Sequence, residues 1–284
     1  MNSYKPVFII GAARSGTTLL RDLVAGHPAI DPIPYDINFI WRMGNESLKH
    51  DEISPEDLSL QQAQRVKDQI TRYHSGAPYL VEKTVSNCLR VPFVKAMFPE
   101  GRFIHLVRNG QDVIESAYRQ WLAPADWRYI FQKALTYPLA DAFGYASTYA
   151  WGLFRKKISR RKTGGVTWGP RYRGIDEDLA KKSVLEVCAI QWDRCVQAAS
   201  AELVSLPSTE VMTVVYEEFV EKPHTNMIRI ANFLDIDPVP FNSAVNQTAI
   251  SRERVGAAEQ ALEKEELAVL LPYIENSLRL LNYA

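Results

Sequence analysis

Cysteine is scarce in this sequence, and neither sign of charge is in excess. The three cysteines, Cys88, Cys188 and Cys195, form no Cys-x-x-Cys pair and have no spacing typical of a zinc site. Lysine and arginine together number 33, as do aspartate and glutamate, so no overall field would draw the chain to nucleic acid. We therefore expect buried, apolar cysteines, and we predict that any anion site depends on a local cluster of basic residues.

Long apolar runs and metal-binding clusters are missing as well. No apolar run reaches the length of a transmembrane helix, and no group of His, Cys, Asp or Glu residues has metal-ligand spacing. The first apolar run begins so close to Met1 that no room is left for a signal peptide. We expect a cytoplasmic protein that needs no metal.

Short apolar runs alternate with helical patterns along the chain. Nearly continuous hydrophobicity is typical of parallel strands covered on both faces, and it occurs at residues 6–10, 78–82, 102–107 and 211–216. Helical patterns occupy residues 17–26, a segment opened by Ser54 as N-cap, 87–98, 110–120, 183–203, 223–234 and about 259–281. The alternation predicts one α/β domain with a doubly wound parallel sheet, whose ligand binds at the carboxyl ends of the strands.

Residues 7–24, VFIIGAARSGTTLLRDLV, carry the clearest motif. An apolar strand leads into a turn from Gly11 to Gly16, and Thr17 opens a helix. Such a loop forms a cradle for phosphate, because backbone N–H groups point inward and the helix dipole favours negative charge. The spacing matches the P-loop except that Thr17 stands where a nucleoside triphosphatase has lysine. This substitution argues against phosphoryl transfer and indicates another anionic donor.

The run R-S-G-T-T-L-L resembles the 5′-phosphosulfate loop of the sulfotransferases, which use 3′-phosphoadenosine 5′-phosphosulfate (PAPS). Two further segments resemble that family in the same order. In residues 101–120, Arg108 ends a strand and Ser116 follows eight residues later; residues 214–236 fit the family's Y-E-x-x-x-x-x-P…I-x-x-F-L segment. The resemblance covers residues 6–236. It implies a P-loop-like fold and transfer of sulfonate to an acceptor hydroxyl, with adenosine 3′,5′-bisphosphate as the second product.

The resemblance also implies a donor site. Arg108 and Ser116 would bind the 3′-phosphate, with Tyr216 and Arg252 near the nucleotide and that phosphate. Arg108 stands out on physical grounds too, because a charge at the end of an apolar strand is costly unless it meets an anion or forms an ion pair. The 5′ end would be held by Arg14, Ser15, Gly16, Thr17 and Thr18.

The expected catalytic residues are a lysine and a carboxylate. Lys83, in L-V-E-K-T at the end of the second predicted strand, is similar to the family's lysine that contacts the transferring group; the alternative is a surface lysine. The family's general base is a carboxylate soon after the first helix. Asp36 is nearest to that position, although it replaces the more usual glutamate, and Asp31 is a competitor. His105 is expected in the core, and His27 is expected to fix a turn.

Residues 121–173 differ in composition from the rest, and we interpret 121–175 as an acceptor-side insertion. They contain 12 of the 30 aromatic residues and a basic run over residues 155–162. An insertion with its own small core and an acceptor-binding lid both remain open. Aromatic and basic residues together suit an acidic acceptor, with a tyrosyl peptide ahead of an anionic glycan or small phenol. Two other readings remain, a non-catalytic nucleotide- or anion-binding protein and, more distantly, a P-loop kinase.

Overall fold

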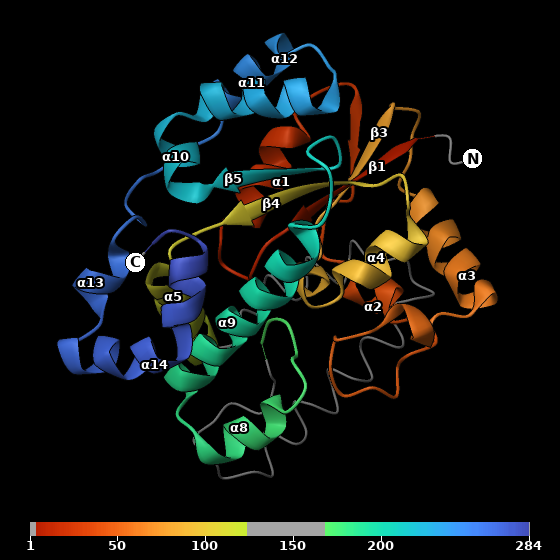
Figure 1. The fold of residues 1–284 in the computed structure, drawn as a ribbon. Helices are drawn as coiled ribbons and strands as arrows, with labels where there is room; N and C mark the ends of the chain where they lie inside the picture. Colours follow the sequence, from red (N-terminus) through yellow and green to blue (C-terminus); the bar gives the residue numbers. More distant parts are fainter. Residues whose placement is uncertain (1–3, 124–167, 284) are drawn as a thin grey trace.

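The centre of the fold is a sheet of five parallel strands (Figure 1). The computed structural model describes residues 4–123 and 168–283. The strands lie in the order β2-β3-β1-β4-β5, so later strands lie on both sides of β1. This order confirms the predicted doubly wound α/β fold. The strand bounds are β1 (Lys5–Ile10), β2 (Ile30–Pro32), β3 (Tyr79–Glu82), β4 (Arg102–Val107) and β5 (Val211–Val215).

Helices cover both faces of the sheet, as the continuous apolar runs predict. Side chains alternate across β1: Val7 and Ile9 join one buried cluster, whereas Phe8 and Ile10 join the other. The first cluster is covered by α1 (Thr17–Val24), α10 (Tyr216–Glu221), α11 (Pro223–Leu234) and α12 (Val239–Gln247) (Figure 1). The second is covered by α2 (Asn38–Trp41), α3 (Leu60–Thr71), α4 (Val91–Met97), α5 (Gly110–Leu122), α8 (Ile175–Lys181), α9 (Val184–Leu203), α13 (Ala257–Ala261) and α14 (Lys264–Leu280).

Four predicted strands are present, and β2 was missed because only three residues form it at the sheet edge. The helix predicted to begin after Ser54 begins later, at Leu60. A single 3-10 turn, η1 (Pro55–Asp57), follows Ser54, the backbone is extended at Leu58, and α3 begins after a second N-cap, Ser59. Two capping boxes in close succession therefore divide the segment, and the second one opens the longer helix.

Two other predicted helices are each divided in two. Residues 87–98 form η2 (Val85–Leu89) and α4, because Arg90 between them has a non-helical backbone and Pro92 opens the new helix. Residues 259–281 form α13 and α14, because Leu262 and Glu263 are extended and Glu263 caps α14.

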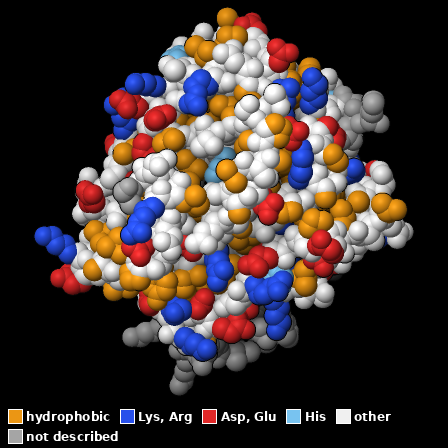
Figure 2. Space-filling model, in the orientation of Figure 1, with side chains coloured by type: hydrophobic (Ala, Val, Ile, Leu, Met, Phe, Trp, Pro, Cys, Tyr) orange, Lys and Arg blue, Asp and Glu red, His pale blue; other side chains and the backbone are white. Residues whose placement is uncertain are grey.

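The three cysteines are buried and free, as expected. Tyr172 is 2% exposed and belongs to the core on the α9 side of the sheet. Residues 124–167 lie outside the described part of the chain, and with them most of the predicted insertion and the whole basic run at 155–162. In residues 4–123 and 168–283, no helix has both the length and the apolar character needed to cross a membrane. On the face drawn in Figure 2, acidic and basic side chains are interspersed, in line with a net charge of zero.

His105 gives the fold a testable dependence on pH. It lies inside β4, and burial lowers its pKa from the ordinary 6.5 to about 4. Below pH 6.5 the unfolded chain therefore binds a proton that the folded chain does not. The stability of the folded chain decreases as the pH is lowered from about 6.5 to the folded pKa. This shift corresponds to a loss of about 3 kcal/mol over that window.

We expect His105→Gln to remove this part of the pH dependence. Urea unfolding of both chains at several pH values between neutral and about 4.5 measures it. The unfolding free energy of the wild type minus that of the variant should decrease as the pH falls. If this difference stays constant, the assignment is contradicted.

Candidate functional site

The predicted phosphate loop lies where β1 ends and α1 begins. The loop leaves the sheet close to β4, because a Cβ added to Gly11 would lie 2.7 Å from the backbone oxygen of Leu106. Arg14 has a left-handed backbone, with φ 74°, as does Gly16, with φ 94°. For a non-glycine residue such a backbone costs on the order of 1–3 kcal/mol and is most often found at functional sites. Ser15 and Thr17 are buried, whereas the side chain of Thr18 is exposed.

Arg108 and Tyr216 pack against this loop. The Arg108 guanidinium lies 4.3 Å from the centre of the Tyr216 ring, and its Nη1 donates to the backbone oxygen of Arg14 over 3.1 Å. The same ring lies so close to Gly16 that an added Cβ would come within 2.5 Å of it. Three segments that are distant in sequence, the loop, the end of β4 and the start of α10, therefore meet at the carboxyl edge of the sheet.

Arg108 also holds the segment before α13. Its Nη2 donates to the backbone oxygen of Arg254 over 2.5 Å, and it lies 3.8 Å from Asp112. Asp112 in turn accepts from the backbone N–H groups of Gly256 and Ala258, at 2.9 Å each, and so caps α13. Arg108 is only 5% exposed, and its buried Nε has no hydrogen-bond partner among the described residues.

A cluster of arginines gathers around Arg14, which contacts Ser116. Arg14 Nε donates to Ser116 Oγ over 3.0 Å. The pKa of Arg14 lies below its ordinary value, first because neighbouring protein displaces water from it and then because Arg119, Arg108 and Arg254 repel its charge. The local basic cluster that a neutral chain requires for an anion site is therefore present.

Two members of this cluster, Arg119 and Arg254, were missed by the sequence analysis. Arg119 lies three residues after Ser116, on the same helix face, and this spacing could have indicated it. Arg254 lies in a loop where periodicity offers no signal. The predicted Arg252 is exposed, like Arg254, but its Nη2 donates to the backbone oxygen of Glu221 over 3.1 Å.

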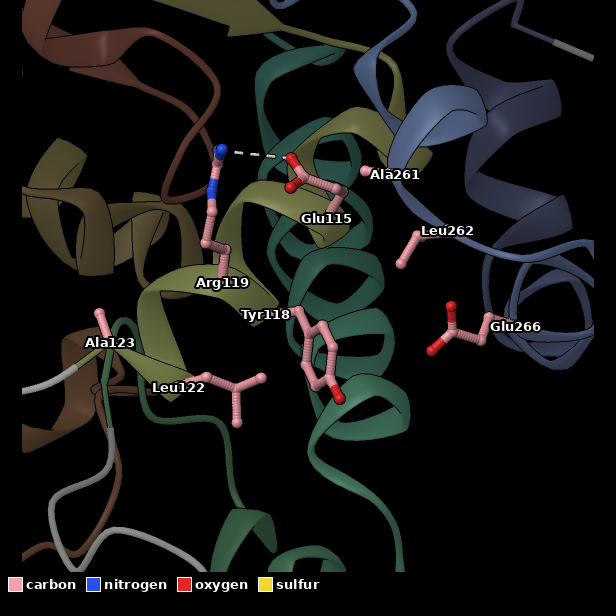
Figure 3. A pocket seen from close by; sticks show the side chains of 8 residues that line it. All are labelled: Glu115, Tyr118, Arg119, Leu122, Ala123, Ala261, Leu262 and Glu266. Carbon is pink, nitrogen blue, oxygen red and sulfur yellow. Dashed lines mark hydrogen bonds and ion pairs between the residues drawn. The ribbon is translucent and has the colours of Figure 1, made fainter.

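A pocket of about 410 Å³ lies beside the cluster, between α5, α13 and α14 (Figure 3). Arg119 and Glu115 form an ion pair at 3.4 Å on one side of it, and Glu266 faces it from α14. The lining residues are Glu115, Tyr118, Arg119, Leu122, Ala123, Ala261, Leu262 and Glu266.

Lys83 and Asp36 lie at the carboxyl ends of the neighbouring strands β3 and β2. Lys83 directly follows β3 and is 6% exposed. Burial raises the pKa of the adjacent Glu82 to about 7, with a further rise from the charge of Asp36 and a partial offset from Lys83. Asp36 accepts from the backbone N–H groups of Asn38 at 3.2 Å and Val85 at 3.1 Å. The structure thus brings the Asp36 segment to the residues that follow Lys83.

Asp31 and His27 are engaged elsewhere. Asp31 accepts from the backbone N–H groups of Ser75 at 2.6 Å and Ala77 at 3.1 Å, which precede β3 and so lie at the opposite edge of the sheet. His27 fixes the turn after α1, as expected: its Nδ1 accepts from the N–H of Ala29 at 3.0 Å, and its Nε2 lies 2.8 Å from the backbone oxygen of Asp237.

Comparison with known proteins identifies the family. A model of the sulfotransferase family matches residues 6–149, just over half of the chain. This chain therefore belongs to the sulfotransferase family. The match includes the phosphate loop, the Lys83 segment, Arg108 and Ser116.

Curated relatives with similar sequences include protein-tyrosine sulfotransferases. The Drosophila melanogaster protein-tyrosine sulfotransferase is 24% identical over 250 residues, which cover 84% of this chain and 39% of that protein. The human protein-tyrosine sulfotransferase 1 is 29% identical over 121 residues, which cover 39% of this chain and 33% of that protein. An uncharacterized Aquifex aeolicus protein is 32% identical over 131 residues, covering 42% of this chain and 17% of that protein. The chain thus spans less than half the length of these relatives.

Solved sulfotransferase structures share the fold. A sulfotransferase from Mycobacterium avium superposes with a TM-score of 0.54 at 12% identity, covering 98% of this chain and 77% of the other. The sulfotransferase domain from the curacin biosynthetic pathway gives a TM-score of 0.51 at 14% identity, covering 96% of this chain and 98% of that domain. At these identities the likeness concerns the fold alone.

Proposed function

We propose that this chain transfers a sulfonate group from PAPS to a hydroxyl group of an acceptor. The observation that carries the proposal is that three features converge at the carboxyl edge of the sheet. They are a glycine loop with a left-handed backbone at Arg14, the start of α1 and a buried arginine with an unpaired N–H group. A donor with phosphates at two positions fits a site that has two separate groups of anion ligands.

The residues divide between the two ends of such a donor. Arg14, Ser15, Gly16, Thr17 and Thr18 form the start of α1, where backbone N–H groups and the helix dipole favour the 5′-phosphosulfate. Arg108 and Ser116 would hold the 3′-phosphate, supported by Arg119 and Arg254, whose charges already act on Arg14. Tyr216 would lie beside the nucleotide, and Arg252 has the weakest support because the contact of its side chain is with the backbone oxygen of Glu221 rather than with the arginine cluster.

Lys83 and Asp36 would serve the transfer itself. PAPS supplies an activated sulfuryl group, and its transfer needs positive charge at the leaving oxygen and removal of a proton from the attacking hydroxyl. Lys83 would supply the charge, and Asp36 would accept the proton. No metal is required for these roles.

The acceptor we propose is acidic, with a tyrosyl peptide ahead of a glycan or small phenol. The protein-tyrosine sulfotransferases among the relatives support this order. Residues 121–175 as an acceptor-side insertion, within a single domain of residues 1–284, and a cytoplasmic location stay predictions. The alternative is a nucleotide-binding protein without activity. The buried Lys83 beside the Asp36 segment favours catalysis, because binding the donor alone would not require either residue.

We expect Arg108→Lys to weaken binding of adenosine 3′,5′-bisphosphate by about tenfold to a hundredfold. Charged hydrogen bonds contribute roughly 1.5–3 kcal/mol each, and lysine cannot reproduce the planar fork of arginine. Titration calorimetry with this ligand and with adenosine 5′-phosphate, which lacks the 3′-phosphate, measures the effect. Arg102→Lys is the matched control and should change binding little, because Arg102 begins β4 at the opposite edge of the sheet, where its Nη1 donates to the backbone oxygen of Phe233 over 2.6 Å. Equal losses for both ligands would contradict the assignment of Arg108 to the 3′-phosphate.

We expect Lys83→Ala to lower turnover by roughly 10²–10³ with little change in donor affinity. Removal of one preorganised charge from a transition state has an effect of this size. Steady-state kinetics at saturating PAPS, together with donor binding, separate the two quantities. Lys95→Ala, at a half-buried lysine paired with Glu210 at 2.5 Å, controls for loss of a lysine elsewhere. Lost donor affinity with normal turnover at saturation would make Lys83 a binding residue.

We expect Asp36→Asn to reduce turnover of an alkyl hydroxyl acceptor by about 10²–10⁴, the usual contribution of a positioned base. A phenol should be less affected because it is more acidic. Asp31→Asn is the control, since the carboxylate of Asp31 is engaged by Ser75 and Ala77. Normal rates with both acceptors in Asp36→Asn, or a larger loss in Asp31→Asn, would move the role away from Asp36.

A further inference from the structure

A network of buried polar side chains lies beneath the Lys83 and Asp36 segments. Its centre is Arg90, which is 1% exposed and lies between η2 and α4. Arg90 Nε donates to Asn87 Oδ1 over 2.9 Å, and its Nη2 donates to Asn38 Oδ1 over 2.5 Å. A buried guanidinium carries a desolvation cost of several kcal/mol, so its retention here calls for a physical explanation.

The two arms of Arg90 reach the two segments that carry the proposed catalytic groups. On one side, Asn87 Nδ2 donates to Glu82 Oε2 over 2.9 Å, and Glu82 directly precedes Lys83. On the other side, the backbone N–H of Asn38 donates to Asp36 Oδ1 over 3.2 Å. Neither arm is a direct contact with Lys83 or Asp36, so Arg90 acts through intermediaries.

The charge of Arg90 also acts on these groups. Burial lowers the pKa of Arg90, and the negative charges of Asp51, Asp36 and Glu82 oppose that decrease. Asp51 accepts from Asn38 Nδ2 at 3.1 Å, Arg42 Nη1 at 2.8 Å and Ser86 Oγ at 2.8 Å. Although burial opposes it, the pKa of Asp51 is lowered, chiefly by Arg90 and these hydrogen bonds. Three carboxyl groups therefore share the field of one fully buried cation.

We propose that Arg90 is a positioning residue for sulfuryl transfer, which holds the Asp36 segment and the Lys83 segment in one arrangement through Asn38 and Asn87. This inference rests on the proposed function. It differs from a purely structural role in one respect. A structural residue affects stability, whereas a residue that positions the base also affects acceptors differently according to whether they need a base.

The effect of losing Arg90 should depend on the acceptor. An acceptor hydroxyl that must give its proton to Asp36 needs that carboxylate in place, whereas an acceptor that is already ionised does not. Loss of Arg90 should therefore slow the first kind of acceptor more than the second.

The test compares Arg90→Gln and Arg90→Lys with the matched control Arg42→Gln. Arg42 shares Asp51 with the network, but its other side-chain bonds go to the backbone oxygens of His50 and Leu48. The values of kcat and KM are measured at about pH 8 with an acidic tyrosyl peptide and with 4-nitrophenol, which is largely ionised there and needs no base. Adenosine 3′,5′-bisphosphate binding and thermal unfolding are measured on the same samples.

We expect Arg90→Gln to lower kcat for the peptide by about tenfold to a hundredfold, part of the usual contribution of a positioned base. The kcat for 4-nitrophenol should fall by a smaller factor, and nucleotide binding should be unchanged. Arg90→Lys keeps the charge but not the planar fork, so it should show the same selective loss for the peptide, by about tenfold or more. Arg42→Gln should lower the melting temperature and leave the ratio of the two kcat values unchanged.

Each contrary result has a distinct meaning. If Arg90→Gln and Arg42→Gln both lower stability and leave the ratio of the two kcat values unchanged, Arg90 has only a structural role and the inference is wrong. If Arg90→Gln does not fold, Arg90→Lys decides, and wild-type kcat in that variant would overturn the inference. If the wild-type chain binds no adenosine 3′,5′-bisphosphate, the proposed function itself fails and this inference with it.

Discussion

The donor side of the site depends on one buried cation, the guanidinium of Arg108. It donates to backbone oxygens of two loops, lies over the ring of Tyr216 and approaches Asp112. Each contact belongs to a different segment, so the phosphate loop, α10 and the segment before α13 share one fixed point. Because a buried charge is costly without partners, these contacts favour one arrangement of the edge before any ligand is bound.

The catalytic side of the same edge follows a similar physical pattern with a second buried arginine. Arg108 and Arg90 are 5% and 1% exposed, and each keeps one buried nitrogen without a hydrogen-bond partner among the described residues. β1 and β3 are neighbouring strands, and their carboxyl ends carry the phosphate loop and Lys83. Around Arg14, the charges of Arg108, Arg119 and Arg254 gather at this edge within a chain that is neutral overall. Such focusing of charge on a low-dielectric surface strengthens its action on an anion.

Most of the fold could be predicted from the sequence, because continuous apolar runs and helical periodicity are local signals. The phosphate loop and the Arg108–Ser116 pair could be predicted because their spacing is part of a motif. Other features depend on tertiary contacts: β2 has only three residues, and Arg254 acquires its place through a bond from Arg108 to its backbone oxygen. The Arg90 network could not be predicted either. Polar residues in 85–90 read as part of a helix, and only the folded chain brings Asn38 and Asp51 to them.

Asp51 also joins this network to the chain that follows residue 167. Its backbone N–H donates to the backbone oxygen of Arg171 over 2.7 Å, and its Oδ2 accepts from the N–H of Arg171 over 2.9 Å. The two residues are 120 positions apart in the chain, so this pair of hydrogen bonds joins segments that are distant in sequence. A change at Asp51 would therefore act at once on the network beneath Lys83 and on the position of Arg171.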